Sequence, residues 1–221
     1  MKELRELTKL QIEKSRRANP KFMQAIESLM KFARAFGDGG EAIGVGKSAP
    51  GFELPNAVGE TVSLAALLEK GPVVVSFSRG SWCPYCNLET QALRARLAEI
   101  KSLGAELVVI SPQKPDDSLS EAEKAALRFH VLSDQDARVA ADYGVAWKVP
   151  DLILEHMRSD RKLDLEEINN GNGSILPIPG VFVLGCDSRV VWRFVDVDYR
   201  MRAEPDDIIS ALQVLAGNSP K

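Results

Sequence analysis

Apolar residues at the start of the chain recur at helical spacing. Leu4, Leu7 and Leu10 predict a short amphipathic helix, and Asn19 before Pro20 predicts the start of a second. Behind that start, apolar positions lie three or four residues apart, at Phe22, Ile26, Leu29, Ala33 and Phe36. Because two helices alone enclose little core, we expect residues 1–43 to be a helical extension of a domain at 44–221.

From about residue 44 the pattern changes to short apolar runs that alternate with amphipathic segments. Residues 73–77 form a β-branched run, typical of a strand covered on both faces. The pattern predicts further strands at 107–110, 130–132, 181–184 and 190–194, and helices after residue 83, over 121–127, over 137–143 and from residue 205. Residues 145–178 are polar and predicted to be irregular, with one short helix near 152–157. This alternation predicts an α/β domain with a mixed central sheet.

Composition excludes several classes of protein. The 221 residues are 45% apolar and 27% charged, with a formal net charge of −3, as in an ordinary globular protein. The chain lacks the basic excess of a nucleic-acid-binding protein, and its apolar runs are too short to span a bilayer. Its N-terminus is charged throughout and lacks the apolar core of a signal peptide. We therefore expect a cytoplasmic protein with no nucleic-acid or membrane partner.

Two of the three cysteines stand together in the CPYC motif at residues 83–86. In a reducing compartment, a CxxC pair indicates either a catalytic dithiol or half of a metal site. Zinc needs four ligands, and the other candidates, Cys186, His130 and His156, supply no second paired motif. We therefore expect a redox-active dithiol with no metal and no other cofactor.

The CxxC motif lies where the predicted strand 73–77 leads into a helix. Cys83 in the first helical turn faces unpaired N–H groups and the positive end of the helix dipole, which stabilise a thiolate. Cys86 lies three residues on, on the same helix face and within reach of a disulfide. Pro84 costs little at a helix start, and Trp82 can shield the pair while leaving one sulfur open. These arguments favour Cys83 as the attacking thiol.

Arg79 is the nearest cation to the motif along the sequence. Such a charge either lowers the pKa of a thiol, orients a peroxide, or is simply a solvated loop residue. The sequence alone leaves these three interpretations open.

Residues 77–89, FSRGSWCPYCNLE, resemble the active-site stretch of redoxins of the peroxiredoxin/alkyl hydroperoxide reductase (AhpC/TSA) group, in its CxxC-bearing branch. Weaker likenesses follow in the same order at 46–55, 107–113, 131–134, 178–183 and 199–205. The resemblance implies a thioredoxin-like fold, with a mixed central sheet flanked by helices. It also makes Pro179 the cis-proline that lies beside the thiols in such folds.

The chain departs from the pattern of that family at the reactive site. Peroxiredoxins carry a PxxxTxxC motif, and Glu89 fits the glutamate that often follows their peroxidatic cysteine, so Cys86 takes the peroxidatic position. Arg79 then replaces the proline, and Cys83 replaces the threonine. The peroxide-orienting arginine of many peroxiredoxins falls at Pro179, which implies that this group is missing. Aligned as a thioredoxin, the chain instead has Cys83 as its exposed nucleophile.

The resemblance implies a thiol peroxidase that reduces hydrogen peroxide or organic hydroperoxides through a Cys83/Cys86 cycle. Its electrons would come from a thioredoxin- or glutaredoxin-type reductant. Two alternatives stay open: a thioredoxin-like protein disulfide reductase, and a redox-sensing module whose disulfide alters partner binding. The N-terminal helices either cap the domain or form a homodimer contact.

Overall fold

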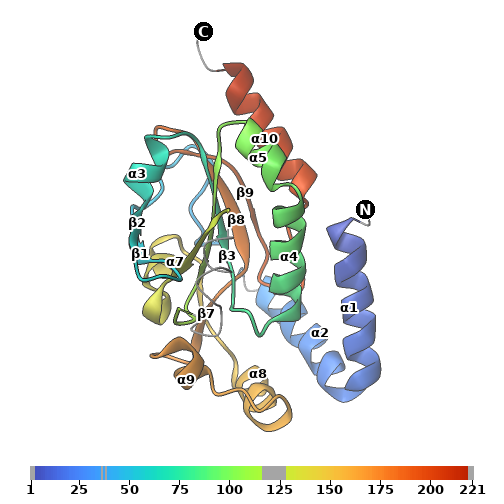
Figure 1. The fold of residues 1–221 in the computed structure, drawn as a ribbon. Helices are drawn as coiled ribbons and strands as arrows, with labels where there is room; N and C mark the ends of the chain where they lie inside the picture. Colours follow the sequence, from blue (N-terminus) through green and yellow to red (C-terminus); the bar gives the residue numbers. More distant parts are fainter. Residues whose placement is uncertain (1–2, 36, 38, 116–127, 219–221) are drawn as a thin grey trace.

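The computed structural model describes residues 3–35, 37, 39–115 and 128–218 (Figure 1). Its centre is a five-stranded mixed sheet in the order β5-β4-β3-β8-β9. The strands are β3 (Val73–Phe77), β4 (Glu106–Ser111), β5 (His130–Ser133), β8 (Gly180–Leu184) and β9 (Val190–Val195). β3, β4 and β5 are parallel, whereas β8 and β9 are antiparallel to their neighbours. All five strands were predicted from the sequence, and the mixed sheet is confirmed.

Both faces of the sheet are covered, which explains the unbroken apolar run of β3. Val73, Val75 and Phe77 point to one face and Val74 to the other, as the two-residue period of a strand requires. The second face packs against α4 (Pro84–Ala95), α5 (Leu97–Ser102) and α10 (Pro205–Asn218). The face with Val73, Val75 and Phe77 is covered by α3 (Leu64–Leu68), the turn Gln135–Ala137 and α7 (Arg138–Asp142). The hairpin of β1 (Glu53–Pro55) and β2 (Thr61–Ser63) covers the same face. Figure 1 shows the two sets of helices on opposite sides of the sheet.

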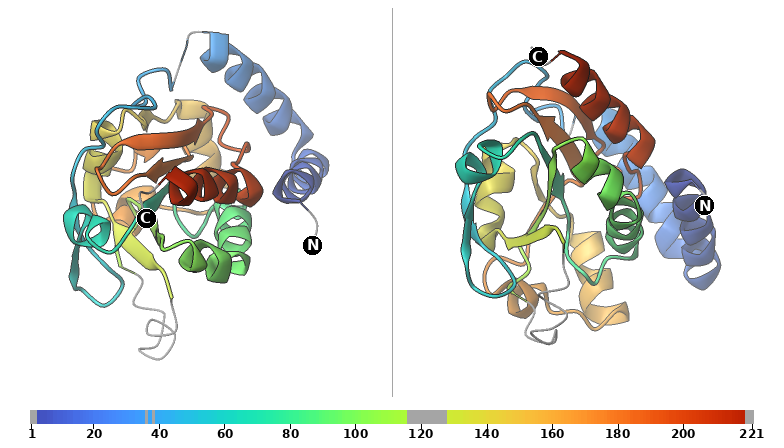
Figure 2. Two further views of the ribbon diagram at one scale, coloured as in Figure 1. Left: turned by 90° about the horizontal axis from the view of Figure 1, so that it is seen from above. Right: turned by 45° about the horizontal axis from the view of Figure 1, so that its top comes forward.

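The N-terminal segment forms the predicted pair of helices, α1 (Leu4–Ala18) and α2 (Pro20–Ala35). The Asn19 side chain accepts a hydrogen bond from the backbone N–H of Phe22 at 3.2 Å, as expected of an N-cap before Pro20. α1 packs against α2 and against α4, so the pair lies along one side of the domain (Figure 2).

Two polar contacts attach this helix pair to the C-terminal part of the chain. The Glu204 carboxylate accepts the backbone N–H groups of Leu4 and Arg5, at 3.1 and 2.6 Å, and thereby caps α1 from outside the helix. At the other end of the pair, Arg34 donates two hydrogen bonds to Asp196, at 3.0 and 2.7 Å.

The prediction of an irregular segment at 145–178 was wrong, although the short helix expected near 152–157 is present as α8 (Asp151–Glu155) and the turn that follows it. This segment contains β6 (Ala146–Lys148) and β7 (Ile175–Pro177), which pair antiparallel, as well as α8, a π-helical turn (His156–Asp160) and α9 (Leu165–Asn169). The elements are three to five residues long, so their polar flanks obscure any periodicity. The helix expected over 121–127 lies outside the described residues.

Glu204→Ala tests how much its carboxylate stabilises the N-terminal helix pair. Loss of an N-terminal cap costs about 1 kcal/mol, so we expect amide hydrogen exchange in α1 to accelerate about fivefold while the central sheet stays protected. Asp206→Ala is the control, since Asp206 is an exposed partner of Arg96 and does not touch α1. Equal exchange in α1 for both variants would contradict the role given to Glu204.

Candidate active site

The CxxC motif lies where the short loop after β3 leads into α4. The motif has Cys83 at the N-cap of α4, Pro84 as the first helical residue and Cys86 in the first turn. The helix start at Pro84 is therefore as predicted. Gly80 in the loop has φ = 129°, and a Cβ there would lie 2.6 Å from the indole nitrogen of Trp82. Glycine is thus required at this position for the loop to turn beneath the indole.

Both thiols are buried, each with only 1% of its surface exposed, and neither forms a disulfide. Their apolar surroundings come from α2, α8, the π-helical turn and Tyr199, and include Ile26, Met30, Ile153 and Met157. The expectation that Trp82 would leave one sulfur open was therefore wrong. The N-terminal helices and the 145–178 segment supply this cover, and local sequence pattern does not show where they pack.

Cys86 is the more acidic of the two thiols. Burial by itself would raise its pKa. Hydrogen bonds from the Cys83 thiol, from the backbone N–H of Arg79 at 3.4 Å and from Ser78, together with the charge of Arg202, outweigh burial and lower it well below the ordinary value. Cys86 is therefore the thiol that these contacts hold as a thiolate.

Cys83 has the opposite bias. Its pKa is raised well above the ordinary value by its hydrogen bond to Cys86, by burial and by the negative charge of Cys86, although Arg79 and Arg202 lower it in part. It makes no side-chain contact with the N–H groups of α4. The arguments from dipole and exposure that favoured Cys83 as the attacking thiol therefore do not hold in the folded protein, because direct contacts to Cys86 outweigh the helix dipole.

Arg202 is a site residue that the sequence analysis missed. Its Nη2 donates a hydrogen bond to the Cys86 sulfur at 3.2 Å, and its Nε lies 2.9 Å from a carboxylate oxygen of Glu89. The arginine whose absence was inferred at Pro179 thus has a counterpart from the segment before α10. The only signal in the sequence was the stretch 199–205, which contains two arginines and resembles the family's C-terminal segment.

Glu89 is buried one turn after Cys86 on α4, where the sequence alone gave it only an alignment role. Burial raises the pKa of its carboxyl to about 8. The charge of Arg202 opposes this rise and the charge of Cys86 adds to it. Glu89 is therefore mostly protonated at neutral pH, beside an arginine that contacts the neighbouring thiol.

Arg79 is not a solvated loop charge, because only 2% of its surface is exposed. Its guanidinium carbon lies 4.3 Å from the ring centre of Tyr199 and 5.2 Å from that of Trp82, so the cation stacks with both rings. The site therefore holds two buried arginines beside two buried thiols.

The expectation of a cis bond before Pro179 was wrong, since the described residues contain no cis peptide bond. Pro179 is buried immediately before β8, where the chain enters the sheet. The trans form is the lower-energy isomer of an X–Pro bond, and the extended entry into β8 accommodates it.

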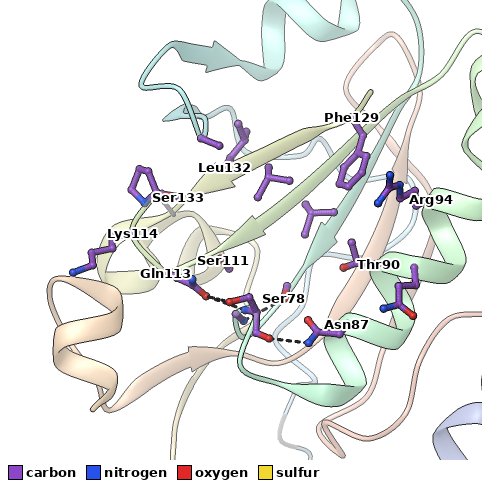
Figure 3. A pocket seen from close by; sticks show the side chains of 17 residues that line it. Ser78, Asn87, Thr90, Arg94, Ser111, Gln113, Lys114, Phe129, Leu132 and Ser133 are labelled. Carbon is purple, nitrogen blue, oxygen red and sulfur yellow. Dashed lines mark hydrogen bonds between the residues drawn. The ribbon is translucent and has the colours of Figure 1, made fainter. Parts of the chain in front are cut away.

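A cavity of about 310 Å³ lies behind the CxxC loop, between α4 and strands β4 and β5 (Figure 3). Its wall includes Ser78, Gly80 and Ser81 but neither cysteine. Gln113 accepts hydrogen bonds from the Ser81 backbone N–H and hydroxyl at 2.8 and 2.9 Å, and Asn87 donates to the Ser81 carbonyl at 2.8 Å. These contacts fix the loop from the side opposite the thiols.

The other candidates lie apart from this site. Cys186 is exposed in the turn between β8 and β9. His130 on β5 pairs with Glu106 on β4, and His156 contacts Asp160 in the π-helical turn. Within the described ranges, no three His, Cys, Asp or Glu side chains are grouped to hold a metal ion. In the same part of the chain, no helix is both long and apolar enough to cross a bilayer.

The fold and the paired thiols define a redoxin of the thioredoxin-like class. A family model described as AhpC/TSA matches residues 45–193, and the chain belongs to the AhpC/TSA family. The α1–α2 pair and Arg202 lie outside the matched residues, so part of the site comes from segments that the family model does not describe.

The curated relatives agree with this assignment, and a solved structure agrees with the fold. Peroxiredoxin Bcp of Escherichia coli strain K12 is 36% identical over 100 residues, 45% of this chain and 64% of that protein. The chloroplastic peroxiredoxin Q of Populus jackii is 35% identical over 100 residues, 45% of this chain and 46% of that protein. The chain therefore spans less than two thirds of the length of either. The crystal structure of peroxidoxin BcpB from Mycobacterium tuberculosis has a TM-score of 0.58 at 24% identity, covering 77% of this chain and 97% of that one.

Glu89 makes stability depend on pH with a defined sign. Its folded pKa of about 8 lies above the unfolded value near 4.5, so folding takes up a proton and this residue destabilises the protein as pH rises between the two. We expect the unfolding free energy of the reduced protein to fall by up to about 1.4 kcal/mol per pH unit in that window, relative to Glu89→Gln. Urea unfolding at several pH values measures this difference.

The control for that measurement is Glu69→Gln, a change at an exposed carboxylate after α3. This variant should keep the pH slope of the wild type. Identical slopes for Glu89→Gln and wild type would show that Glu89 is ionised in the folded protein at neutral pH.

Proposed function

We propose that this protein is a thiol peroxidase that reduces hydrogen peroxide or organic hydroperoxides, with Cys86 as the attacking thiol and Cys83 as the resolving thiol. The observation that carries this assignment is the hydrogen bond of Arg202 to the Cys86 sulfur at 3.2 Å, which favours a buried thiolate beside a cation. A thiolate at neutral pH and a cation that can bind a peroxide oxygen are the two requirements of the first step.

In the first step the Cys86 thiolate attacks one peroxide oxygen, the O–O bond breaks, and Cys86 is oxidised to a sulfenic acid. The leaving oxygen takes up a proton and departs as water or an alcohol. Glu89 is a buried source of that proton beside Arg202. In the second step Cys83 attacks the sulfenic sulfur, the S–O bond breaks, and water leaves as the Cys83–Cys86 disulfide forms.

A reductant then returns two electrons to the disulfide. Membership of the AhpC/TSA family and the likeness to proteins named peroxiredoxin support a peroxide as oxidant and a thioredoxin- or glutaredoxin-type dithiol as reductant. Trp82, Arg79 and Pro84 support the pair by shielding it, by adding positive charge and by starting α4. Pro179, buried before β8, is assigned a packing role beside them.

The extension at 1–43 serves the domain at 44–221 as a cap in this proposal. Ile26 and Met30 pack in the same apolar cluster as both thiols, which supports a cap over a dimer contact. A cap of this kind favours small peroxides over protein disulfides as first substrates, because both cysteines of the reduced protein are only 1% exposed.

Stopped-flow oxidation of Cys83→Ser and Cys86→Ser tests the assignment of the two thiols. We expect Trp82 fluorescence to report oxidation orders of magnitude faster than that of a free thiol in wild type and in Cys83→Ser, whereas Cys86→Ser loses the fast phase. Cys83→Ser should stop at a sulfenic acid that a sulfenic-acid reagent traps. All proteins carry Cys186→Ser so that the exposed third thiol does not contribute.

A fast phase retained in Cys86→Ser and lost in Cys83→Ser would reverse the roles. If no protein reacts faster than a free thiol, the peroxidase proposal fails. Reduction of insulin disulfides would then identify a disulfide reductase, and release of a partner on stoichiometric oxidation would identify a redox sensor.

Arg202→Met tests the role of the guanidinium at Cys86. Loss of a charge-assisted hydrogen bond costs about 1.5–3 kcal/mol, so we expect the peroxide step to slow by roughly 10- to 150-fold at neutral pH. The pKa of Cys86, followed by thiolate absorbance in the ultraviolet, should rise. Arg202→Lys should retain part of both properties. Arg94→Met, at an exposed arginine on α4, is the control and should match the wild type.

A further inference from the structure

Arg79 is a buried cation without an acidic partner. The part of the chain that the structure describes contains no carboxylate within ion-pair distance of its guanidinium, and its Nη2 has no hydrogen-bond acceptor there. Only the faces of Trp82 and Tyr199 stack against it. A buried unpaired charge is costly and is retained where a negative charge forms beside it during function.

The contacts of the two arginines indicate which thiol would carry the negative charge that faces Arg79. Arg202 hydrogen bonds to the Cys86 sulfur and is engaged there and at Glu89. Arg79 donates its backbone N–H to the Cys86 sulfur, and its guanidinium charge acts on Cys83 and on Tyr199. Both arginines therefore act on Cys83, and Arg79 is the one of the two that lacks an acidic partner among the described residues.

The state of Cys83 changes when Cys86 is oxidised. In the reduced protein, the hydrogen bond to Cys86, burial and the negative charge of Cys86 raise the pKa of Cys83. Oxidation of Cys86 to an uncharged sulfenic acid removes the thiolate that accepts this hydrogen bond, and with it the repelling charge. Burial then still raises the pKa of Cys83, and the positive charges of Arg79 and Arg202 still lower it. Because the two contributions of Cys86 are gone, the Cys83 thiolate becomes easier to form.

We propose that Arg79 is a positioning residue for the second step of the cycle, in which it stabilises the Cys83 thiolate as that thiolate attacks the sulfenic acid on Cys86. This inference rests on the proposed function and extends it. Cys83 loses its proton and donates an electron pair to the Cys86 sulfur; the S–O bond breaks, and the hydroxide takes up a proton and leaves as water. Neither arginine is consumed.

The other ionisable groups around Cys83 do not replace Arg79. Tyr85 on α4 and Tyr199 before α10 are uncharged at neutral pH, since burial raises the pKa of both phenols. Glu89 faces Arg202, and its carboxyl is mostly protonated beside the Cys86 thiolate. Arg202 also acts on Cys83, but its guanidinium is already in contact with the Cys86 sulfur and with the Glu89 carboxyl.

Arg79→Met and Arg79→Lys, in single-turnover oxidation with one equivalent of an alkyl hydroperoxide, separate the two steps. We expect both variants to slow hydroperoxide consumption much less than disulfide formation. Disulfide formation in Arg79→Met should slow about tenfold or more, because one pKa unit at Cys83 changes its thiolate fraction tenfold. Trapped sulfenic acid should accumulate accordingly. Arg79→Lys should restore most of the second-step rate, and Arg94→Met is the control with unchanged rates.

The pH profile distinguishes loss of charge from loss of packing. In Arg79→Met the rate of disulfide formation should level off at a pH about one unit higher than in the wild type. A packing defect alone would lower the rate by the same factor at every pH. A slower first step with an unchanged second step would overturn the proposal and assign Arg79 to the peroxide.

A titration that needs no peroxide decides the assignment independently of the proposed function. In Cys86→Ser, with Cys186→Ser, Cys83 is the remaining thiol, and the pH dependence of its alkylation gives its pKa. We expect this pKa to rise by at least about one unit when Arg79→Met is added, and to rise less with Arg79→Lys. Equal values in all three proteins would overturn the inference. A slow peroxide reaction of the wild type would instead overturn the proposed peroxidase.

Discussion

The site depends on the contacts of one buried guanidinium, that of Arg202, with two acidic groups, the Cys86 thiol and the Glu89 carboxyl. Arg202 reaches the Cys86 sulfur with one nitrogen and the Glu89 carboxylate with another. Both acids lie on the same face of α4, and burial raises the pKa of each. Arg202 is shared by both acids, so the additional hydrogen bonds to Cys86 decide which of them carries the negative charge. These hydrogen bonds favour the thiolate of Cys86, and Glu89 keeps its proton.

The thioredoxin-like frame and the segments beyond it contribute differently to this arrangement. The frame, within residues 45–193, supplies β3, the CxxC loop and the start of α4. Part of the enclosure and the cation come from outside it, from α2 and from the segment before α10. These two segments are tied to each other, because Glu204 caps α1 and Asp196 pairs with Arg34. Helix pair and arginine therefore form one structural unit that closes over the thiols.

Burial changes how the CxxC motif should be interpreted. In an exposed motif the N-terminal cysteine has the lower pKa, since it is closest to the helix dipole, and this argument favoured Cys83. A helix dipole contributes only about 0.3–1 kcal/mol at an exposed site. Inside the protein, direct hydrogen bonds to charged groups contribute about 1.5–3 kcal/mol each. Cys86 receives such contacts from Arg202 and from neighbouring donors, so the order of the two pKa values is reversed.

The sequence by itself determined the sheet, the helix pair, the position of the CxxC motif at a strand–helix junction and the family likeness. These features are encoded locally, in runs such as 73–77, in the Asn19–Pro20 cap and in the motif at 83–86. The tertiary structure alone decided that both thiols are buried, that Arg79 stacks against two rings, that Pro179 follows a trans bond and that Arg202 contacts Cys86. The physical reason is sequence separation: Cys86 and Arg202 lie 116 positions apart, and no periodicity or local propensity records which distant charge the folded chain brings to a sulfur.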